Sequence, residues 1–243
     1  MRPSGQHCCV VTGAGRGLGL EFARQLAVRG DFVVGACRSL DSAGDLRAAL
    51  GAQGMVVELD VTDARSVSAA ATAVGRDLDA IDLLINAAGV EDSPASGGPL
   101  AGLERDALIS VFAVNVAGPA VVTRAFAALL ARSDGAVVVN LTSRMGLLDP
   151  PVPPGNIGYA ISKAGLNVLT VKLARELDAT ATVVVAISPG WVRTDMGGPG
   201  APLSAQESVA GMLRVIERLG PGDSGAILGH DGTDLLAHGA ERA

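Results

Sequence analysis

The chain has 243 residues, of which 49% are hydrophobic and 18% are charged, and its formal net charge at pH 7 is −6. This length and apolar content predict a single domain over residues 1–243, of a size typical of an α/β enzyme, with a large hydrophobic core. The negative charge, without a basic stripe, argues against nucleic acid and anionic membranes as partners. We also expect no membrane-spanning segment, because no apolar run in the sequence has the required length.

The N-terminus and the cysteines bear on the compartment. Residues 1–6 are polar, and the apolar run after them is too short for the hydrophobic region of a signal peptide. The three cysteines, Cys8, Cys9 and Cys37, fall in predicted strands and lack the spacing of metal ligands. We therefore expect reduced thiols that pack as small hydrophobic side chains, a cytoplasmic protein, and no metal site.

Short β-branched runs alternate along the chain with longer alanine-rich stretches of helical periodicity. Strands that are apolar on both faces and separated by helices are typical of a parallel sheet with right-handed crossovers. The sequence therefore predicts the α/β class, as a Rossmann-type doubly wound parallel sheet of about seven strands with helices on both faces. The predicted strands are residues 8–12, 32–37, 55–59, 83–86, 136–141, 183–187 and 226–228, and the predicted helices are residues 17–29, 40–50, 64–77, 103–131, 158–178 and 205–219.

Glycine and proline mark the breaks in this pattern. Gly118 and Pro119 interrupt the 103–131 stretch, which we expect to form two helices. Stretches rich in glycine and proline predict loops over a substrate site near residues 90–102, 145–157 and 195–205. Residues 149–154 include four prolines, so this segment is expected to form either a stiff wall beside the substrate or a plain surface connection.

A glycine-rich turn follows the first predicted strand. Residues 12–19 read TGAGRGLG, with glycine at Gly13, Gly17 and Gly19. Glycine allows a tight turn there and a close approach of the backbone to a pyrophosphate at a helix N-terminus. Arg16 and Leu18 lie within the same turn. The position of this glycine-rich turn between a strand and a helix predicts the binding site of a dinucleotide.

The end of the second predicted strand indicates which dinucleotide binds. Sheets of this kind that bind NAD place an acidic residue there to hold the ribose 2′-hydroxyl, whereas this chain has Cys37 followed by Arg38. A guanidinium forms bidentate bonds with a phosphate group. Arg38 and Arg16 therefore predict NADP(H), bound through its 2′-phosphate, unless both are solvated surface charges.

Tyr159 is the single tyrosine of the chain, and Lys163 follows it by four residues in a predicted helix. Positions i and i+4 lie on one face of a helix, so the ammonium group can lie near the phenol. A free phenol has a pKa of about 10, and a nearby positive charge lowers it. The pair is a candidate acid–base group for interconverting a carbonyl and an alcohol. A surface tyrosine with an incidental lysine would show the same spacing.

Together with further motifs in order, these residues resemble the short-chain dehydrogenase/reductase family along nearly the whole chain. The residues from Pro189 onward and residues 143–146 also resemble its C-factor/sniffer-like carbonyl reductase subgroup. The further motifs are Asp60-Val61 after the third predicted strand, Asn86-Ala87-Ala88-Gly89 after the fourth, Asn115 in the next helix, Ser143 after the fifth strand, and Pro189-Gly190 with Thr194 after the sixth.

The resemblance implies a role for each matching residue. Tyr159 would protonate the developing alkoxide, Lys163 would lower the tyrosine pKa and hold the nicotinamide ribose, and Ser143 would bind the substrate carbonyl. Asn115 would anchor a water molecule in a proton relay through Lys163. Besides Tyr159 and Lys163, the positions implied to contact the cofactor are Gly13, Arg16, Gly17, Leu18, Gly19, Arg38, Asp60, Val61, Asn86, Ala87, Ala88, Gly89, Pro189, Gly190, Val192 and Thr194. Asn86 has an alternative role in bracing the sheet.

The resemblance then implies reduction of the carbonyl of a ketone or aldehyde by NADPH, in a homodimer or homotetramer. Met145, Leu147, Trp191 and Met196 are expected to line the pocket, so the small-molecule substrate should be mostly apolar. One alternative is NADP-dependent oxidation of a secondary alcohol, because the same residues serve both directions. Another is a non-catalytic protein that senses NADP, although such a protein has no use for the full set of proton-transfer residues.

Overall fold

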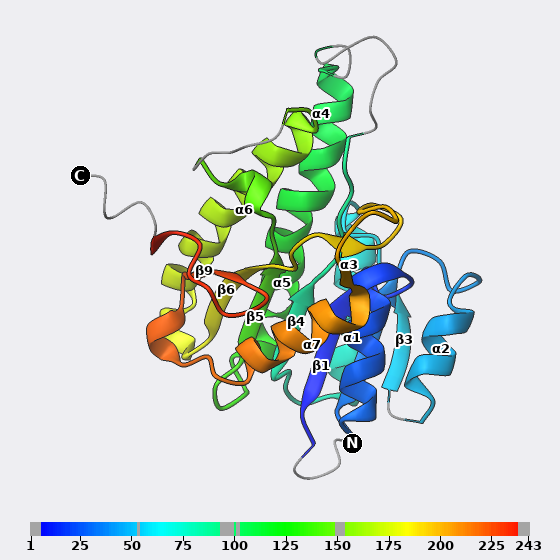
Figure 1. The fold of residues 1–243 in the computed structure, drawn as a ribbon. Coiled ribbons are helices and arrows are strands. Elements are labelled where there is room, and N and C mark those ends of the chain that lie inside the picture. The colour runs from blue at the N-terminus through cyan, green and yellow to red at the C-terminus, as the bar shows by residue number, and fades with distance from the viewer. Residues whose placement is uncertain (1–5, 53, 93–99, 101–102, 149–153, 238–243) are drawn as a thin grey trace.

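Seven parallel strands form the central sheet in the part of the chain that the structure describes (Figure 1). The structure is a computed structural model, and it describes residues 6–52, 54–92, 100, 103–148 and 154–237. The strand order is β3-β2-β1-β4-β5-β6-β9, and all neighbours are parallel. The strands are β1 (Cys8–Thr12), β2 (Phe32–Cys37), β3 (Gly54–Glu58), β4 (Leu83–Asn86), β5 (Val137–Leu141), β6 (Val183–Ser188) and β9 (Ile227–Gly229).

The order of the strands reverses between β1 and β4. From this central pair, β2 and β3 extend toward one edge, and β5, β6 and β9 extend toward the other. In open parallel sheets, ligands bind beyond the carboxyl ends of the strands at such a reversal. The topology therefore directs attention to the residues that follow β1, β4, β5 and β6.

Helices cover both faces of the sheet, as Figure 1 shows. Residues of α1, α2 and α7 pack in one hydrophobic cluster, and residues of α3, α5 and α6 pack in the other. The helices are α1 (Gly17–Val28), α2 (Gly44–Leu50), α3 (Ala64–Asp77), α4 (Arg105–Phe112), α5 (Gly118–Leu130), α6 (Ile157–Glu176) and α7 (Ala205–Ile216).

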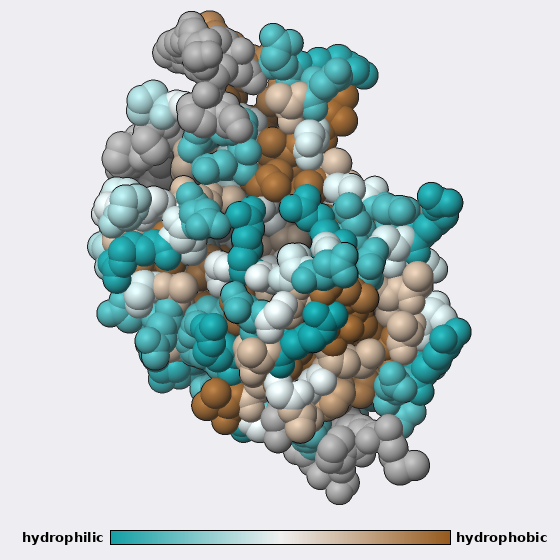
Figure 2. All heavy atoms as spheres, turned by 90° about the vertical axis from the view of Figure 1, so that its right-hand side faces the viewer, coloured by the Kyte–Doolittle hydropathy of each residue, from teal (hydrophilic) through white to brown (hydrophobic). Residues whose placement is uncertain are grey.

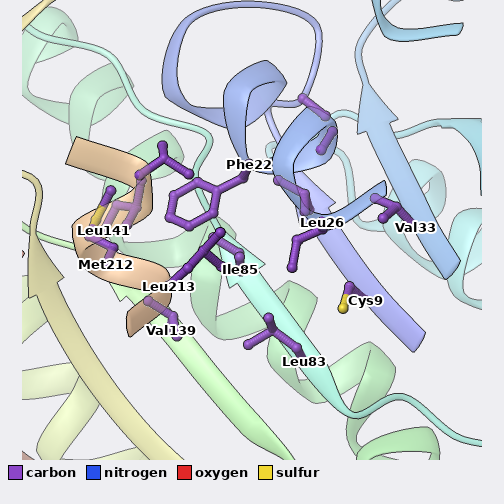
Figure 3. Packing of buried hydrophobic residues seen from close by; sticks show 14 of the residues in the cluster. Cys9, Phe22, Leu26, Val33, Leu83, Ile85, Val139, Leu141, Met212 and Leu213 are labelled. Atoms are coloured by element: carbon purple, nitrogen blue, oxygen red, sulfur yellow. The ribbon is translucent and has the colours of Figure 1, made fainter. Parts of the chain in front are cut away.

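Successive residues of a strand belong to different clusters. In β1, Cys9 and Val11 belong to the cluster that contains Phe22 of α1, which Figure 3 shows from close by. Cys8 and Val10 belong to the cluster on the other face. Successive side chains of a strand point to opposite faces. An uninterrupted apolar run is therefore what a strand covered by helices on both sides requires.

The predicted fold class is confirmed, and all seven predicted strands lie within one residue of their observed ends. One predicted helix begins late, because residues 40–43 form a bend and a turn before α2. The sequence did not reveal β7 (Val192–Arg193) and β8 (Leu203–Ser204), which pair in parallel. Strands of two residues are too short to produce a recognisable period.

The expectation of two helices over residues 103–131 was met in part, because α5 begins at the expected Gly118 but is continuous with the helical residues before it. The structure has one helical run from α4 to α5, joined by a π-helical segment over Ala113–Ala117. The proline is tolerated because Pro119 lies in the first turn of α5. This run, Arg105–Leu130, also meets the length and hydropathy criteria of a membrane span, contrary to expectation. Core helices of globular proteins meet the same criteria, and Val122, Phe126 and Leu130 are fully buried against the sheet.

Part of the predicted loop structure lies outside the described residues. This applies to residues 93–99 and 101–102 of the first predicted substrate loop, and to residues 149–153, which hold most of the proline-rich segment. The expectation that this segment forms a stiff wall remains a prediction.

Phe22 offers a test of the packing, because its side chain is fully buried between α1 and the sheet. Phe22→Ala should lower the free energy of unfolding by about 3–5 kcal/mol, through lost burial and the cavity left behind. Urea unfolding at 25 °C measures the change. Val28→Ala, on the same helix but 83% exposed, is the control, and its effect should stay within about 0.5 kcal/mol. A loss for Phe22→Ala as small as that of the control would contradict the packing.

Candidate active site

Ser143, Tyr159 and Lys163 meet beyond the carboxyl end of β5. Ser143 follows β5 closely, and its hydroxyl accepts a hydrogen bond from the Met145 amide at 3.2 Å and interacts with the Tyr159 phenol. Tyr159 and Lys163 lie one turn apart near the start of α6. The Lys163 ammonium nitrogen lies 5.4 Å from the centroid of the Tyr159 ring. The structure thus brings together the three residues that the sequence proposed as a reacting group.

Burial sets the protonation of this group. It raises the pKa of Tyr159 to about 12, with the Ser143 hydrogen bond opposing and the Glu91 carboxylate adding to the rise. Lys163 is buried, donates to the Leu141 carbonyl at 2.7 Å, and has its pKa lowered to about 8 by burial. Desolvation disfavours the charged form of both groups, so it opposes the lowering of the tyrosine pKa that was expected from Lys163, and that role of Lys163 remains a prediction. Near neutral pH the phenol holds its proton.

Asn115 lies in the π-helical segment and is fully buried. Its side-chain oxygen accepts from the Val90 amide at 2.9 Å, and its nitrogen donates to the Val90 carbonyl at 2.8 Å and to the Ser162 hydroxyl at 2.9 Å. A Cβ placed on Gly89 would lie 3.5 Å from the Asn115 oxygen and 3.8 Å from the Lys163 nitrogen. Asn115 and Lys163 therefore face the same glycine. The water relay between them remains a prediction.

The glycine-rich turn lies against the residues that follow β4. Gly13 has a φ of 65°, and a Cβ on it would come within 2.7 Å of the Ala88 Cα. A Cβ on Gly19 would come within 2.3 Å of the Gly13 carbonyl oxygen. The Thr12 hydroxyl accepts hydrogen bonds from the Ala87 and Ala88 amides. Glycine is thus required by close backbone contacts, and the turn is shaped as a phosphate cradle needs.

The two arginines proposed to bind phosphate have different acidic neighbours. Arg16 forms an exposed ion pair with Asp195 at 3.0 Å, which connects the glycine-rich turn to the segment after β7. Arg38 is exposed at the end of β2, and its charge contributes to the lowered pKa of Asp60. Asp60 itself accepts from the Thr62 amide and hydroxyl, which contribute most to that lowering. Both guanidinium groups remain accessible to a ligand at this edge.

Asn86 braces the sheet, which is the alternative that the sequence left open. Its side-chain nitrogen donates to Asn140 of β5 at 2.9 Å and to Thr123 of α5 at 3.3 Å. Asn140 in turn donates to Thr170 of α6 at 2.9 Å. This chain of buried polar groups joins two strands to the helix that carries Tyr159. The Asn86 side chain is therefore directed into the fold.

The other proposed cofactor residues occupy the same edge of the sheet. Gly17, Leu18 and Gly19 begin α1, Ala87 to Gly89 follow β4, and Val61 is buried beneath Gly118. After β6, the Pro189 carbonyl accepts from Ser208 of α7 at 2.7 Å, and Gly190 has a φ of 79°. Thr194 accepts from the Gly197 amide at 3.1 Å, next to the buried Val192.

Of the four apolar residues proposed to contact substrate, three are at least partly exposed, and one packs against a hydrophobic cluster that includes β9. Trp191 is 60% exposed and Met196 is 42% exposed, and the Trp191 nitrogen donates to the Gly197 carbonyl at 2.8 Å. Met145 is partly buried next to Ser143. Leu147 instead packs against the cluster of Ala186, Ile227 and Leu235. Figure 2 shows hydrophobic surface in a notch between the end of the molecule that carries α4 and the rest.

Sequence reasoning missed several residues that organise the site. Asp92 and Asp195 contact residues that are far away in the sequence, and no local sequence pattern predicts such contacts. Ser162 is a further residue of this kind, because its hydroxyl links Asn115 to the Tyr159 carbonyl. The surface grooves found along α3 and between α3 and α5 contain none of the proposed site residues.

Comparison with known proteins agrees with this geometry. The family described as short chain dehydrogenase matches residues 7–202. The chain belongs to the short-chain dehydrogenase family. Members of this family are oxidoreductases that use a nicotinamide cofactor, and the crowded glycine-rich turn at the strand reversal fits the pyrophosphate of such a group.

Individual relatives of this short-chain dehydrogenase confirm the resemblance to the C-factor/sniffer-like subgroup. The C-signal protein of Myxococcus xanthus is 39% identical over 155 residues, which are 64% of this chain and 92% of that protein. The NADPH-bound carbonyl reductase from chicken fatty liver has a TM-score of 0.87 at 31% identity, covering 94% of this chain and 98% of that one. Carbonyl reductase Sniffer of D. melanogaster has a TM-score of 0.86 at 26% identity, with the same coverage.

Gly13 and Gly30 allow the backbone crowding to be measured. Both have positive φ, but a Cβ on Gly30 would meet nothing within 4 Å. Gly30→Ala should therefore cost only the left-handed strain, about 1–2 kcal/mol. Gly13→Ala should cost more, because Ala88 must also move, and should weaken binding of a nicotinamide dinucleotide. Thermal unfolding and calorimetric titration of the two variants test this. Equal losses in stability would show that Gly13 is not crowded.

Proposed function

We propose that this short-chain dehydrogenase reduces the carbonyl group of a mostly apolar ketone or aldehyde with NADPH. The observation that supports it most is the meeting of Ser143, Tyr159 and a buried Lys163 at the strand reversal, beside the glycine-rich turn. When bound, the nicotinamide supplies a hydride to the carbonyl carbon. The protein must then stabilise the negative charge that develops on the carbonyl oxygen and provide a proton.

Tyr159 and Ser143 are suited to that task. The Ser143 hydroxyl lies beside the phenol, so both groups can donate to one substrate oxygen. The pKa of about 12 keeps the phenol protonated at neutral pH, as a general acid requires. The Lys163 ammonium, held by the Leu141 carbonyl, lies where it can stabilise the phenolate left after proton transfer. Asn115 would complete the return of the proton through a bound water molecule.

For cofactor binding, we propose that Gly13, Gly17, Leu18 and Gly19 hold the pyrophosphate. Arg38 and Arg16 would bind the 2′-phosphate, and Asp60 and Val61 would contact the adenine. On the nicotinamide side, Lys163 would bind the ribose, and Val192 and Thr194 the carboxamide. The remaining contacts proposed are backbone ones, from Asn86, Ala87, Ala88, Gly89, Pro189 and Gly190. The NADPH carried by the chicken carbonyl reductase is consistent with this choice.

The apolar side chains around the site favour an apolar substrate. Trp191 and Met196 present exposed hydrophobic surface on the segment after β6, and Met145 lies beside Ser143. Leu147 is directed toward the β9 edge and is the weakest of the proposed contacts. We propose that Trp191, Met196 and Met145 contact the substrate.

We further propose that the protein acts in the cytoplasm as a homodimer or homotetramer. Its cysteines are free and buried, as suits a reducing compartment. Neighbouring helices α4 and α6 carry exposed apolar side chains, and burying them against a second copy would favour association. These side chains are Ile109, Phe112, Ile161, Val168 and Val171.

Tyr159→Phe tests the proposed acid, because it removes only the phenolic hydroxyl. With a ketone that the wild-type protein reduces, followed by NADPH absorbance, kcat should fall by roughly 10²–10⁴-fold. Folding and NADPH binding, measured by thermal unfolding and by fluorescence, should be retained. If the variant keeps near-normal turnover, some other group supplies the proton.

Arg38→Ala tests the proposed cofactor preference. Loss of a charge-assisted contact worth about 1.5–3 kcal/mol before screening should lower kcat/KM for NADPH about tenfold or more and leave that for NADH almost unchanged. Arg65→Ala, which removes a 96% exposed arginine from α3, is the matched control and should change neither. A wild-type protein with equal or higher kcat/KM for NADH would contradict the proposal.

A further inference from the structure

Helix α6, which carries Tyr159 and Lys163, begins without a cap of its own. The residue before its first turn, Asn156, has a left-handed backbone with φ of 47° and ψ of 43°. The Asn156 side chain makes no capping hydrogen bond. Helix N-termini present amide groups without partners in the helix, and a partly buried terminus requires acceptors from elsewhere. The first amides of α6 therefore depend on residues outside the helix.

Asp92 supplies those acceptors from a distant part of the chain. One of its carboxylate oxygens accepts from the Tyr159 amide at 2.7 Å, and the other accepts from the Gly158 amide at 3.0 Å. Both bonds are charge-assisted, and the carboxylate lies at the positive end of the helix dipole. The carboxyl group also lies close to the helix backbone, because a Cβ placed on Gly158 would lie 3.4 Å from it.

The segment Gly89–Asp92, which we call the strap, is also bound to the side chain of Asn115. Val90 of the strap exchanges two hydrogen bonds with the Asn115 side chain. Asn115 also donates to Ser162, whose hydroxyl donates to the Tyr159 carbonyl at 2.7 Å. The amide and the carbonyl of Tyr159 are thus both held, directly or through Ser162, by the strap and Asn115. This closed set of hydrogen bonds surrounds the residue that must present its hydroxyl to the substrate.

We propose that Asp92 is a positioning residue, which fixes the backbone of Tyr159 and thereby places its hydroxyl for proton transfer. The proposal rests on the proposed function, because it assigns Asp92 a part in the same reaction without contact with substrate or cofactor. Proton transfer depends steeply on the placement of the donor, so a small displacement of the first turn of α6 should lower kcat. Removal of a residue that only caps the helix would lower the free energy of unfolding and leave kcat unchanged.

The single tyrosine of the chain makes the contact directly observable. Protein labelled with ¹⁵N-tyrosine should give one backbone amide signal, that of Tyr159, and this amide donates to Asp92. We expect the proton shift to lie downfield, as for a short charge-assisted bond, and to move upfield in Asp92→Ala. Asp92→Asn keeps one acceptor oxygen and should give an intermediate shift. An unchanged signal in Asp92→Ala would overturn the proposal.

Kinetics separate positioning from capping. Asp92→Ala should lower kcat about 10–100-fold, with the Kd of NADPH within about threefold of wild type and with Asp92→Asn recovering part of the loss. The matched control is Asp63→Ala, which removes the carboxylate that caps α3 through the Arg65 amide at 2.8 Å. That variant should lose comparable thermal stability and keep its kcat. Wild-type kcat in Asp92→Ala, or an equal loss of kcat in Asp63→Ala, would overturn the proposal.

The two measurements also separate this proposal from the proposed function. If wild-type protein reduces no carbonyl compound with NADPH, the proposed function fails, and the tyrosine amide signal alone decides whether Asp92 holds Tyr159. If Asp92→Ala does not fold, Asp92→Asn carries both tests: a shifted amide signal with a lower kcat supports the proposal, and wild-type values for both overturn it.

Discussion

The parallel direction of all seven strands is the constraint on which the rest of the site depends. It brings the residues after β1, β4, β5 and β6 to one edge of the sheet, although they are far apart in the sequence. The contacts at this edge are close, as the Thr12 hydroxyl between β1 and the residues after β4 shows. Lys163 closes the arrangement by donating from α6 to the last residue of β5. The glycine-rich turn and the reacting residues are therefore parts of one rigid frame.

Burial shifts the pKa values of Tyr159 and Lys163. The same desolvation raises the pKa of Tyr159 and lowers that of Lys163, so the phenol is protonated and the ammonium is only weakly held in its charged form. The protonated phenol is available as a proton donor. A negative charge that forms beside Lys163 would stabilise the charged form of the lysine. The buried chain from Asn86 through Asn140 to Thr170 anchors α6 to the sheet. Helix α6 is thus held by polar contacts inside the core as well as by the strap at its first turn.

Much of the fold and the site could be predicted from the sequence. Apolar runs buried on both faces gave all seven strands of the sheet, and the spacing of Tyr159 and Lys163 gave their common helix face. What failed were features set by distant contacts. The π-helical segment, the Asp92 contact with α6 and the ion pair between Arg16 and Asp195 depend on segments that meet only in the folded chain. The raised pKa of Tyr159 could not be predicted, because its main cause is burial, which the sequence does not display.

The central claim is that this short-chain dehydrogenase transfers hydride from a nicotinamide to a carbonyl carbon. The most direct measurement is mass spectrometry of the alcohol formed from an apolar ketone in the presence of NADPH deuterated at both C4 positions. The account predicts an alcohol that carries one deuterium, bonded to the former carbonyl carbon. Consumption of the cofactor without deuterium in the product, or no reduction across a range of apolar ketones and aldehydes, would contradict it.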